Sequence, residues 1–389
     1  MSERPQEPDA APIRWRILVH ALDRTGPPML VRSFVRWLHE QVPLDPIEVL
    51  AFRGGPLEAD LEPMARVTVV LDHHEPWDHE RPDPDRAAAL RRRLATLEPV
   101  DVNLLVSTSG GQVLPLLGDH VGPVVTWSVE MGPDLHWLDG DVISLRARTD
   151  VWLAGSSTTA AELARLLDGP APAVVPEFVD QPSPASAEEE DRVRSATGID
   201  PATPLVLGAG IGTHRKGMDL FVEVAVAVAA RTDRPVHFAW VGGEADPLYP
   251  LVDAEVQRLG IEHVTLHPPV PDLTPWLRTA SLFVHTARED AFPLVCLHAA
   301  AVGVPVVAFS GTGGVTEMFG DAFVGDPFPD VAALADRVVS LTDGSAGATR
   351  HALGEAQRQR VAADHLAPAA AATLREAVLS ALDHAAVAP

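Results

Sequence analysis

Lys216 is the only lysine in the 389-residue chain, and all its other Lys+Arg residues are arginine. It follows Arg215 in a turn that also contains Gly210 and Gly212. An apolar run, Leu205–Leu207, precedes this turn, and a segment with helical apolar spacing follows it. Free backbone N–H groups and the helix dipole favour negative charge at such a turn. The pattern predicts an anion site, and the alternative is an ordinary strand-to-helix turn with a solvated lysine.

Acidic and polar residues follow a second predicted strand, Leu282–His285, in the same half of the chain. Glu289 and Asp290 come soon after it, at the carboxyl edge where sites of α/β proteins form. His298 lies eight residues after Asp290 on the next predicted helix, and a glycine loop, Gly311–Gly314, offers further backbone donors. The basic pair would hold a diphosphate, and Asp290 or His298 would bond ribose or sugar hydroxyls. No metal is required, because cations and helix N-termini stabilise the leaving group.

Apolar strand candidates alternate with helical segments along the whole chain, which predicts α/β architecture with parallel sheets. The expected strands are 16–21, 47–52, 67–71, 102–106, 124–127 and 151–154, then 205–207, 236–241, 264–267, 282–285 and 304–309. Asp180–Asp191, rich in Pro, Ser and Glu, is the predicted linker. We therefore expect one domain over 13–180 and a second over 181–373. A last helix, about 374–389, is expected to pack back on the first domain.

The net charge of −24 argues against binding to nucleic acid or to anionic membranes, which depends on basic surface. The single cysteine, Cys296, rules out an intramolecular disulfide and fits a reducing compartment. The polar N-terminus has no signal-peptide core, and no apolar run reaches the ~20 residues that span a bilayer. We expect a cytoplasmic protein without membrane insertion, and the sequence leaves a homodimer open.

Several motifs occur in a characteristic order in the C-terminal half: RKGMDLF, WVGGE, VPDL, TAREDAFPLV and GVPVVAFSGTGG. Together they resemble the retaining glycosyltransferases of family 4. The likeness covers nearly all of the chain and is loose in the N-terminal half. It implies the GT-B fold, an α/β architecture of two Rossmann-like doubly wound domains that face each other across a cleft. The resemblance further implies that the domain over 13–180 binds the acceptor and the domain over 181–373 binds the nucleotide sugar.

The resemblance also implies roles for individual residues. The catalytic group would be Arg215, Lys216, Glu289 and Asp290, in which the first two hold the diphosphate. The donor-binding group would be Gly26, Gly210, Gly212, Gly243, Val270, Pro293, Leu294, His298, Gly313 and Gly314. Two positions depart from the family pattern. His298 stands where the family has a second glutamate, and Val129 stands where relatives often have histidine.

Acceptor-binding residues are expected in the N-terminal half: Arg24, Thr108, Trp127, Glu130 and Trp137. The alternative for the two tryptophans is core packing, and for Thr108 it is a simple Ser/Thr turn. The loop Asp72–Glu80 is rich in histidine and carboxylate, but its spacing matches no metal-ligand pattern. We interpret it as a solvated acidic loop, with a contact to the acceptor or to a cation as the alternative, and predict no metal site.

The predicted function is transfer of a sugar from a nucleotide diphospho-sugar to a small acceptor, with retention of anomeric configuration. A UDP- or GDP-sugar donor would be the only cofactor. The Ala-, Arg- and Pro-rich, lysine-poor composition suggests bacterial secondary metabolism. The alternatives are a nucleotide-sugar epimerase of the same fold, a non-catalytic sugar-nucleotide-binding relative, and a phosphorylase with a pyridoxal Schiff base on Lys216.

Overall fold

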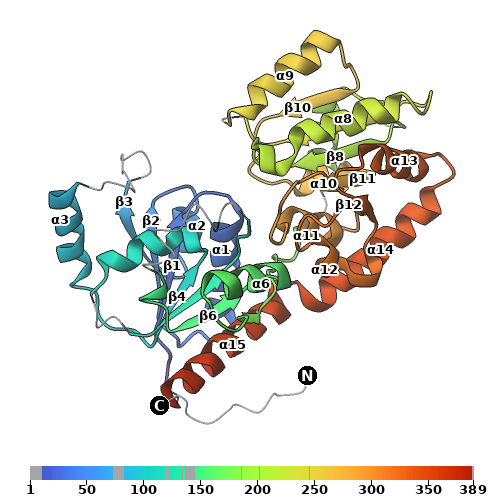
Figure 1. The fold of residues 1–389 in the computed structure, drawn as a ribbon. Coiled ribbons are helices and arrows are strands. Elements are labelled where there is room, and N and C mark those ends of the chain that lie inside the picture. Colours follow the sequence, from blue (N-terminus) through green and yellow to red (C-terminus); the bar gives the residue numbers. More distant parts are fainter. Residues whose placement is uncertain are drawn as a thin grey trace. The chain divides into compact units, whose positions relative to one another are not determined.

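The computed structural model describes residues 11–72, 83–118, 122–132, 135, 145–184, 186–200, 202–244 and 246–387. The chain forms two compact α/β units (Figure 1). Unit 1 comprises Met1–Gly155, Leu163–Val175 and Ala371–Pro389, and unit 2 comprises Ser156–Glu162 and Pro176–Ala370. Neither unit is one continuous segment.

The described strands of unit 1 form one parallel sheet in the order β3-β2-β1-β4-β5-β6-β7. They are β1 Trp15–Ala21, β2 Ile47–Arg53, β3 Arg66–Leu71, β4 Val102–Val106, β5 Val124–Ser128, β6 Val151–Ala154 and β7 Ala173–Val174. The helices are α1 Gly26–Gln41, α2 Glu58–Leu61, α3 Pro84–Leu94, the 3₁₀ helix η1 Thr108–Leu116, and α6 Ser157–Leu166, which continues from unit 2. The strand order reverses between β1 and β4, the kind of position where sites form in doubly wound sheets.

Unit 2 has a second parallel sheet, in the order β10-β9-β8-β11-β12-β13. Its described strands are β8 Leu205–Ala209, β9 His237–Val241, β10 Val264–His267, β11 Leu282–His285, β12 Val306–Ser310 and β13 Gly325–Pro327. The helices are α7 Ala187–Thr197, η2 His214–Lys216, α8 Met218–Ala229, α9 Leu248–Leu259, α10 Thr274–Thr279, α11 Leu294–Ala301, α12 Val315–Phe319, η3 Gly320–Ala322, α13 Val331–Thr342 and α14 Gly347–Asp364. Here the order reverses between β8 and β11.

Helices cover both faces of the unit 2 sheet. Because successive side chains of a strand point to opposite faces, neighbouring residues pack in different clusters. Leu205 and Leu207 of β8 pack in a cluster with α10, α11 and α12. Val206, between them, packs in another cluster with α8, α9 and α13, where the rings of Phe221 and Trp240 lie 5.4 Å apart. Burial on both faces explains why these strands are continuous apolar runs in the sequence.

The structure confirms the predicted α/β class with two Rossmann-like parallel sheets. The strands β7 and β13 were not expected, because Ala173–Val174 and Gly325–Pro327 carry no strand signal of their own. The predicted linker Asp180–Asp191 is wrong in its second half. Its acidic residues begin α7, whose first turn favours negative charge, and Val193 of α7 is buried in the core.

The last helix, α15 (Ala367–Val387), begins in unit 2 and continues in unit 1. In unit 1, Arg375 Nη2 lies 3.7 Å from Asp45 Oδ2, and the same carboxylate accepts from Trp15 Nε1 at 3.2 Å. Leu374 on this helix is fully buried. Unit 1 therefore includes a helix from the far end of the sequence.

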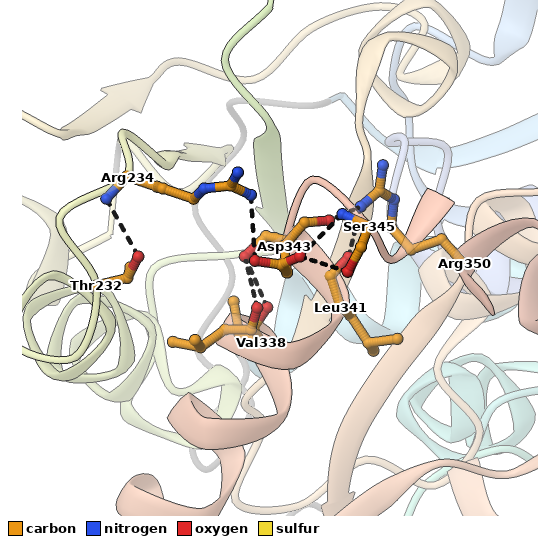
Figure 2. Close-up of polar contacts among 9 residues, drawn as sticks. Thr232, Arg234, Val338, Leu341, Asp343, Ser345 and Arg350 are labelled. Atoms are coloured by element: carbon orange, nitrogen blue, oxygen red, sulfur yellow. Dashed lines mark hydrogen bonds and ion pairs between the residues drawn. The ribbon is translucent and has the colours of Figure 1, made fainter. Parts of the chain in front are cut away.

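Asp343 holds the turn between α13 and α14 (Figure 2). Its Oδ1 accepts from Ser345 N at 2.8 Å and from Ser345 Oγ at 2.6 Å, and its Oδ2 accepts from Arg234 Nη1 at 3.1 Å. Arg350 Nη1 donates to Leu341 O at 2.6 Å. These contacts connect the α13–α14 turn to the segment before β9.

Candidate functional site

The candidate site lies at the reversal point of the unit 2 sheet. Strands β8 and β11 are neighbours, with Val206 paired to Leu282 and Leu207 paired to Phe283. The glycine turn follows β8, and the acidic segment follows β11. Because both strands end at the same edge, residues about 75 positions apart in sequence meet there.

Lys216 and Asp290 form an ion pair at this edge, with Nζ to Oδ2 at 2.5 Å. Burial alone would raise the pKa of Asp290, but the positive charge of Lys216 lowers it below its usual value. His285 Nε2 lies 3.6 Å from the same oxygen. Burial lowers the pKa of His285 to about 4, so at neutral pH the countercharge of Asp290 is Lys216.

Arg215 lies beside this pair and donates from Nη1 to the backbone oxygen of Glu289 at 2.9 Å. The structure thus brings together the predicted residues Arg215, Lys216 and Asp290 within unit 2. Glu289 contributes its carbonyl to this arrangement, and a catalytic role for its carboxylate stays a prediction.

The glycines of the turn allow close packing, and two of their N–H groups have partners within the fold. Gly210 N–H donates to Val241 O at 3.1 Å, and Gly212 N–H donates to Asp246 Oδ2 at 2.6 Å. A Cβ on Gly243 would lie 2.3 Å from the nitrogen of Gly212. β9 and the segment after it therefore already use these two N–H groups, and contacts of Gly210 and Gly212 with a nucleotide-sugar donor stay predictions. Positive charge at this turn comes from side chains.

The second glycine loop packs against Asp290. Asp290 N donates to Thr312 O at 2.8 Å, and Gly314 N donates to Asp290 O at 3.1 Å. Asp290 and Gly313 form a parallel bridge, and Gly313 has a φ of 134°, which favours glycine. The loop fixes the backbone of Asp290. The N–H of Gly314 is used in doing so, and a contact between Gly314 and the donor stays a prediction.

Other predicted donor-binding residues lie on or near α11. Pro293 precedes this helix as its N-cap residue, and His298 is half-buried in its second turn. Leu294 and Val270 are partly buried and pack against the core. Their contacts with a donor stay predictions.

In unit 1, Glu130 is an internal hydrogen-bonding centre. Its carboxylate accepts from Ser107 Oγ, from Thr108 N and Oγ1 at 3.1 and 3.0 Å, from Ser128 Oγ at 3.3 Å and from Val129 N at 3.1 Å. Ser107 has a positive φ of 77°, a strained conformation for a residue with a Cβ. The polar groups of Glu130 and Thr108 thus hold the ends of β4 and β5 together, and an acceptor-binding role for these two residues stays a prediction.

The prediction that Trp127 binds an acceptor is wrong, and core packing is correct. Its ring is fully buried, and Nε1 donates to Val175 O at 3.0 Å. Trp137 lies outside the described residues. Arg24 Nη2 lies 3.7 Å from Asp60 Oδ2, and Gly26 is the first residue of α1.

Sequence reasoning missed three residues of the candidate site in unit 2. Asp246 accepts the Gly212 N–H, His285 lies beneath Asp290, and Arg288 contacts the glycine turn. The one available signal was a charged or titratable residue inside or next to a predicted motif, as with Arg288 in TAREDAF.

Within the described residues, no group of three or more His, Cys, Asp or Glu side chains could hold a metal. Most of the acidic loop that raised this question, 73–80, lies outside them. A search of the described helices finds none that is long and apolar enough to cross a membrane.

Gly217→Ala will destabilise the protein strongly. Gly217 has a φ of 69°, and a Cβ there would lie 2.0 Å from Thr286 O. The left-handed conformation alone costs about 1–2 kcal/mol, and the clash adds to it. Gly198→Ala is the matched control, since Gly198 has a φ of 65° and no atom within 4 Å of the new Cβ. Equal losses of unfolding free energy in urea titrations of both variants would contradict this prediction.

Residues 203–343 match the family model described as glycosyl transferases group 1. The lipopolysaccharide core biosynthesis mannosyltransferase LpsB of Rhizobium meliloti (strain 1021) is 34% identical over 169 residues, 41% of this chain and 45% of LpsB. D-inositol 3-phosphate glycosyltransferase 1 of Catenulispora acidiphila is 32% identical over 183 residues, 43% of this chain and 44% of that protein. The chain therefore spans less than half the length of these curated relatives.

Solved structures match almost the whole chain, and two of them serve as examples. Anabaena HepE in complex with UDP-glucose has a TM-score of 0.76 at 16% identity, covering 96% of this chain and 100% of HepE. Sucrose-phosphate synthase from Thermosynechococcus elongatus has a TM-score of 0.76 at 18% identity, covering 95% and 100%. These likenesses confirm the predicted GT-B fold.

Proposed function

We propose that this protein is a retaining glycosyltransferase that moves a sugar from a nucleotide diphospho-sugar to a small acceptor. The observation that carries the proposal is the meeting of Arg215, Lys216 and Asp290 at the reversal point of the unit 2 sheet. The match of residues 203–343 to group 1 glycosyl transferases supports it, as do the names of the relatives.

In this proposal the two cations take the charge of the departing diphosphate. The bond between the anomeric carbon and the phosphate oxygen breaks, and a bond from that carbon to the acceptor oxygen forms on the same face. The acceptor proton passes to the leaving phosphate oxygen. Arg215 and Lys216 stabilise the charge that develops on that oxygen, and the proposed scheme requires no metal.

Asp290 would meet the sugar of the donor. Its carboxylate is held ionised by Lys216 and can accept a hydrogen bond from a sugar hydroxyl. His298, on helix α11, would add a single hydrogen bond to the donor. A UDP- or GDP-sugar is the proposed donor, in keeping with the UDP-glucose complex of HepE. The Ala-, Arg- and Pro-rich, lysine-poor composition suggests bacterial secondary metabolism, so we propose a natural product as the acceptor.

The test begins with a thermal-shift panel of UDP, GDP, ADP and TDP, because a bound ligand raises the melting temperature. The sugar nucleotides of the binding base are then incubated with candidate acceptors, among them D-inositol 3-phosphate, the substrate in one relative's name. The anomeric configuration of the product is determined by NMR. An inverted product would overturn retention.

Two other outcomes would replace the proposal. A new sugar nucleotide formed without any acceptor would indicate an epimerase. Saturable binding of a sugar nucleotide without turnover of any acceptor would indicate a non-catalytic relative.

A further inference from the structure

The turn that carries Arg215 and Lys216 is fastened to the segment after β11 by its backbone. Arg288 N donates to Arg215 O at 2.8 Å, and Thr286 Oγ1 donates to Gly217 O at 2.8 Å. Lys216 N donates to Thr213 O at 3.0 Å within the turn itself. The position of both basic side chains therefore depends on contacts between two loops.

The side chain of Arg288 adds a charged clamp to this junction. Its Nη1 donates to His214 O at 2.7 Å and to Asp219 Oδ1 at 2.8 Å, and its Nη2 donates to Asp219 Oδ2 at 2.7 Å. This is a bidentate pair, the geometry in which arginine is strongest and most directional. The two side chains are 20% and 29% exposed, so solvent screens the pair only in part.

Asp219 lies in the first turn of α8, immediately after the turn that carries the basic pair. Burial opposes its charge, but Arg288 lowers the pKa of Asp219 below its usual value. The hydrogen bond to Asp219 in turn raises the pKa of Arg288. The clamp thus ties three elements together: η2, the start of α8 and the loop after β11.

We propose that Arg288, held by Asp219, is a positioning residue that orients Arg215 and Lys216 toward the diphosphate of the donor. The inference rests on the proposed function. Arg288 acts through the backbone of His214 and Arg215, and its own charge is balanced by Asp219. Loss of the clamp frees the turn, and small displacements at such a site cost large factors in binding or rate.

Asp219→Asn separates this role from direct electrostatics. The substitution removes a negative charge close to an anion site, so long-range Coulomb attraction alone predicts tighter binding of a diphosphate. The clamp predicts weaker binding, because the neutral amide has a single acceptor oxygen and cannot form the charged bidentate pair with Arg288. We expect Asp219→Asn and Arg288→Met each to weaken binding about tenfold. The double variant should be no weaker than either single one, since the two residues act as a unit.

The measurement is calorimetric binding of inorganic pyrophosphate and of UDP and GDP. Arg337→Met is the matched control, because Arg337 makes a similar bidentate pair with Asp326 at 2.7 and 2.8 Å in the same unit. Unchanged or tighter binding by Asp219→Asn would overturn the proposal. So would additive losses in the double variant, or an equal loss in the control.

The single lysine supplies a readout that does not need a ligand. Labelling with ¹⁵N-lysine gives one backbone amide signal, that of Lys216, whose N–H reports the turn. This signal should shift or broaden in Arg288→Met and Asp219→Asn but not in Arg337→Met. An unchanged signal in the first two variants overturns the clamp. Failure of the wild-type protein to bind any diphosphate would instead overturn the proposed function. The amide signal of Lys216 would still test whether Arg288 and Asp219 hold the turn.

Discussion

Lys216→Met will lower turnover of a nucleotide sugar by at least about a hundredfold and weaken binding of the nucleoside diphosphate. Methionine keeps much of the side-chain length but removes the ammonium ion, which lies 2.5 Å from Asp290. No other lysine in the chain can replace it. Steady-state kinetics with the donor identified by the nucleotide panel measure the effect. A kcat/KM close to that of the wild-type protein would sink the proposed role of this residue.

This variant also leaves the carboxylate of Asp290 buried without its partner, which on its own costs about 3–5 kcal/mol. Lys216→Met/Asp290→Asn is the necessary companion, because it removes both charges. We expect the double variant to regain most of the lost stability in urea titrations and to stay inactive. Recovery of activity together with stability would show that Lys216 only supports the fold.

Unfolding free energy will fall between about pH 6.5 and pH 4, and buried His285 will be a major cause. Burial lowers the pKa of His285 to about 4, whereas an unfolded histidine takes up its proton near pH 6.5. Between pH 6.5 and pH 4, His285 is protonated in the unfolded state but not in the folded state, so acid favours unfolding. The protonation of this one histidine in the unfolded state lowers the unfolding free energy by about 3 kcal/mol at pH 4.

His285→Gln should flatten this pH dependence by the same amount, because glutamine does not titrate. Burial also lowers the pKa of His237 to about 4, so the wild-type curve contains more than one histidine. The comparison between wild type and variant isolates His285. Urea titrations at pH 7, 5.5 and 4.5 provide the measurement, and parallel curves for the two proteins would contradict the prediction.

The positions of most strands along the chain could be predicted because these strands are apolar runs that are largely buried. Val102–Val106, Val264–His267 and Leu282–His285 match the predicted bounds. The edge strand β13 could not be predicted in this way. Gly325–Pro327 has no strand propensity, and it is a strand because Ala308, Phe309 and Ser310 of β12 pair with it. A strand of this kind is defined by its neighbour.

The candidate site, like the fold, could be predicted only in part. The rule that parallel strands share a carboxyl edge correctly brought Lys216 and Asp290 together. The rule that glycine turns offer free N–H groups failed at Gly212, because the carboxylate of Asp246 lies 34 residues away in sequence and already accepts that bond. The acceptor-binding role predicted for Trp127 is a related case, since its Nε1 donates to Val175 O, 48 residues away in sequence. Hydrogen-bond partners outside a motif cannot be found from the motif.

The course of α15 has a consequence for synthesis on the ribosome. Residues 371–387 belong to unit 1, and the ribosome adds Arg375 and buried Leu374 only after residues 176–370 of unit 2. At about 5–20 residues per second, roughly 10–40 s separate Val175 from this helix. Nascent unit 1 must wait through the synthesis of unit 2 before Asp45 meets Arg375. Unit 1, whose synthesis begins first, is therefore completed after unit 2.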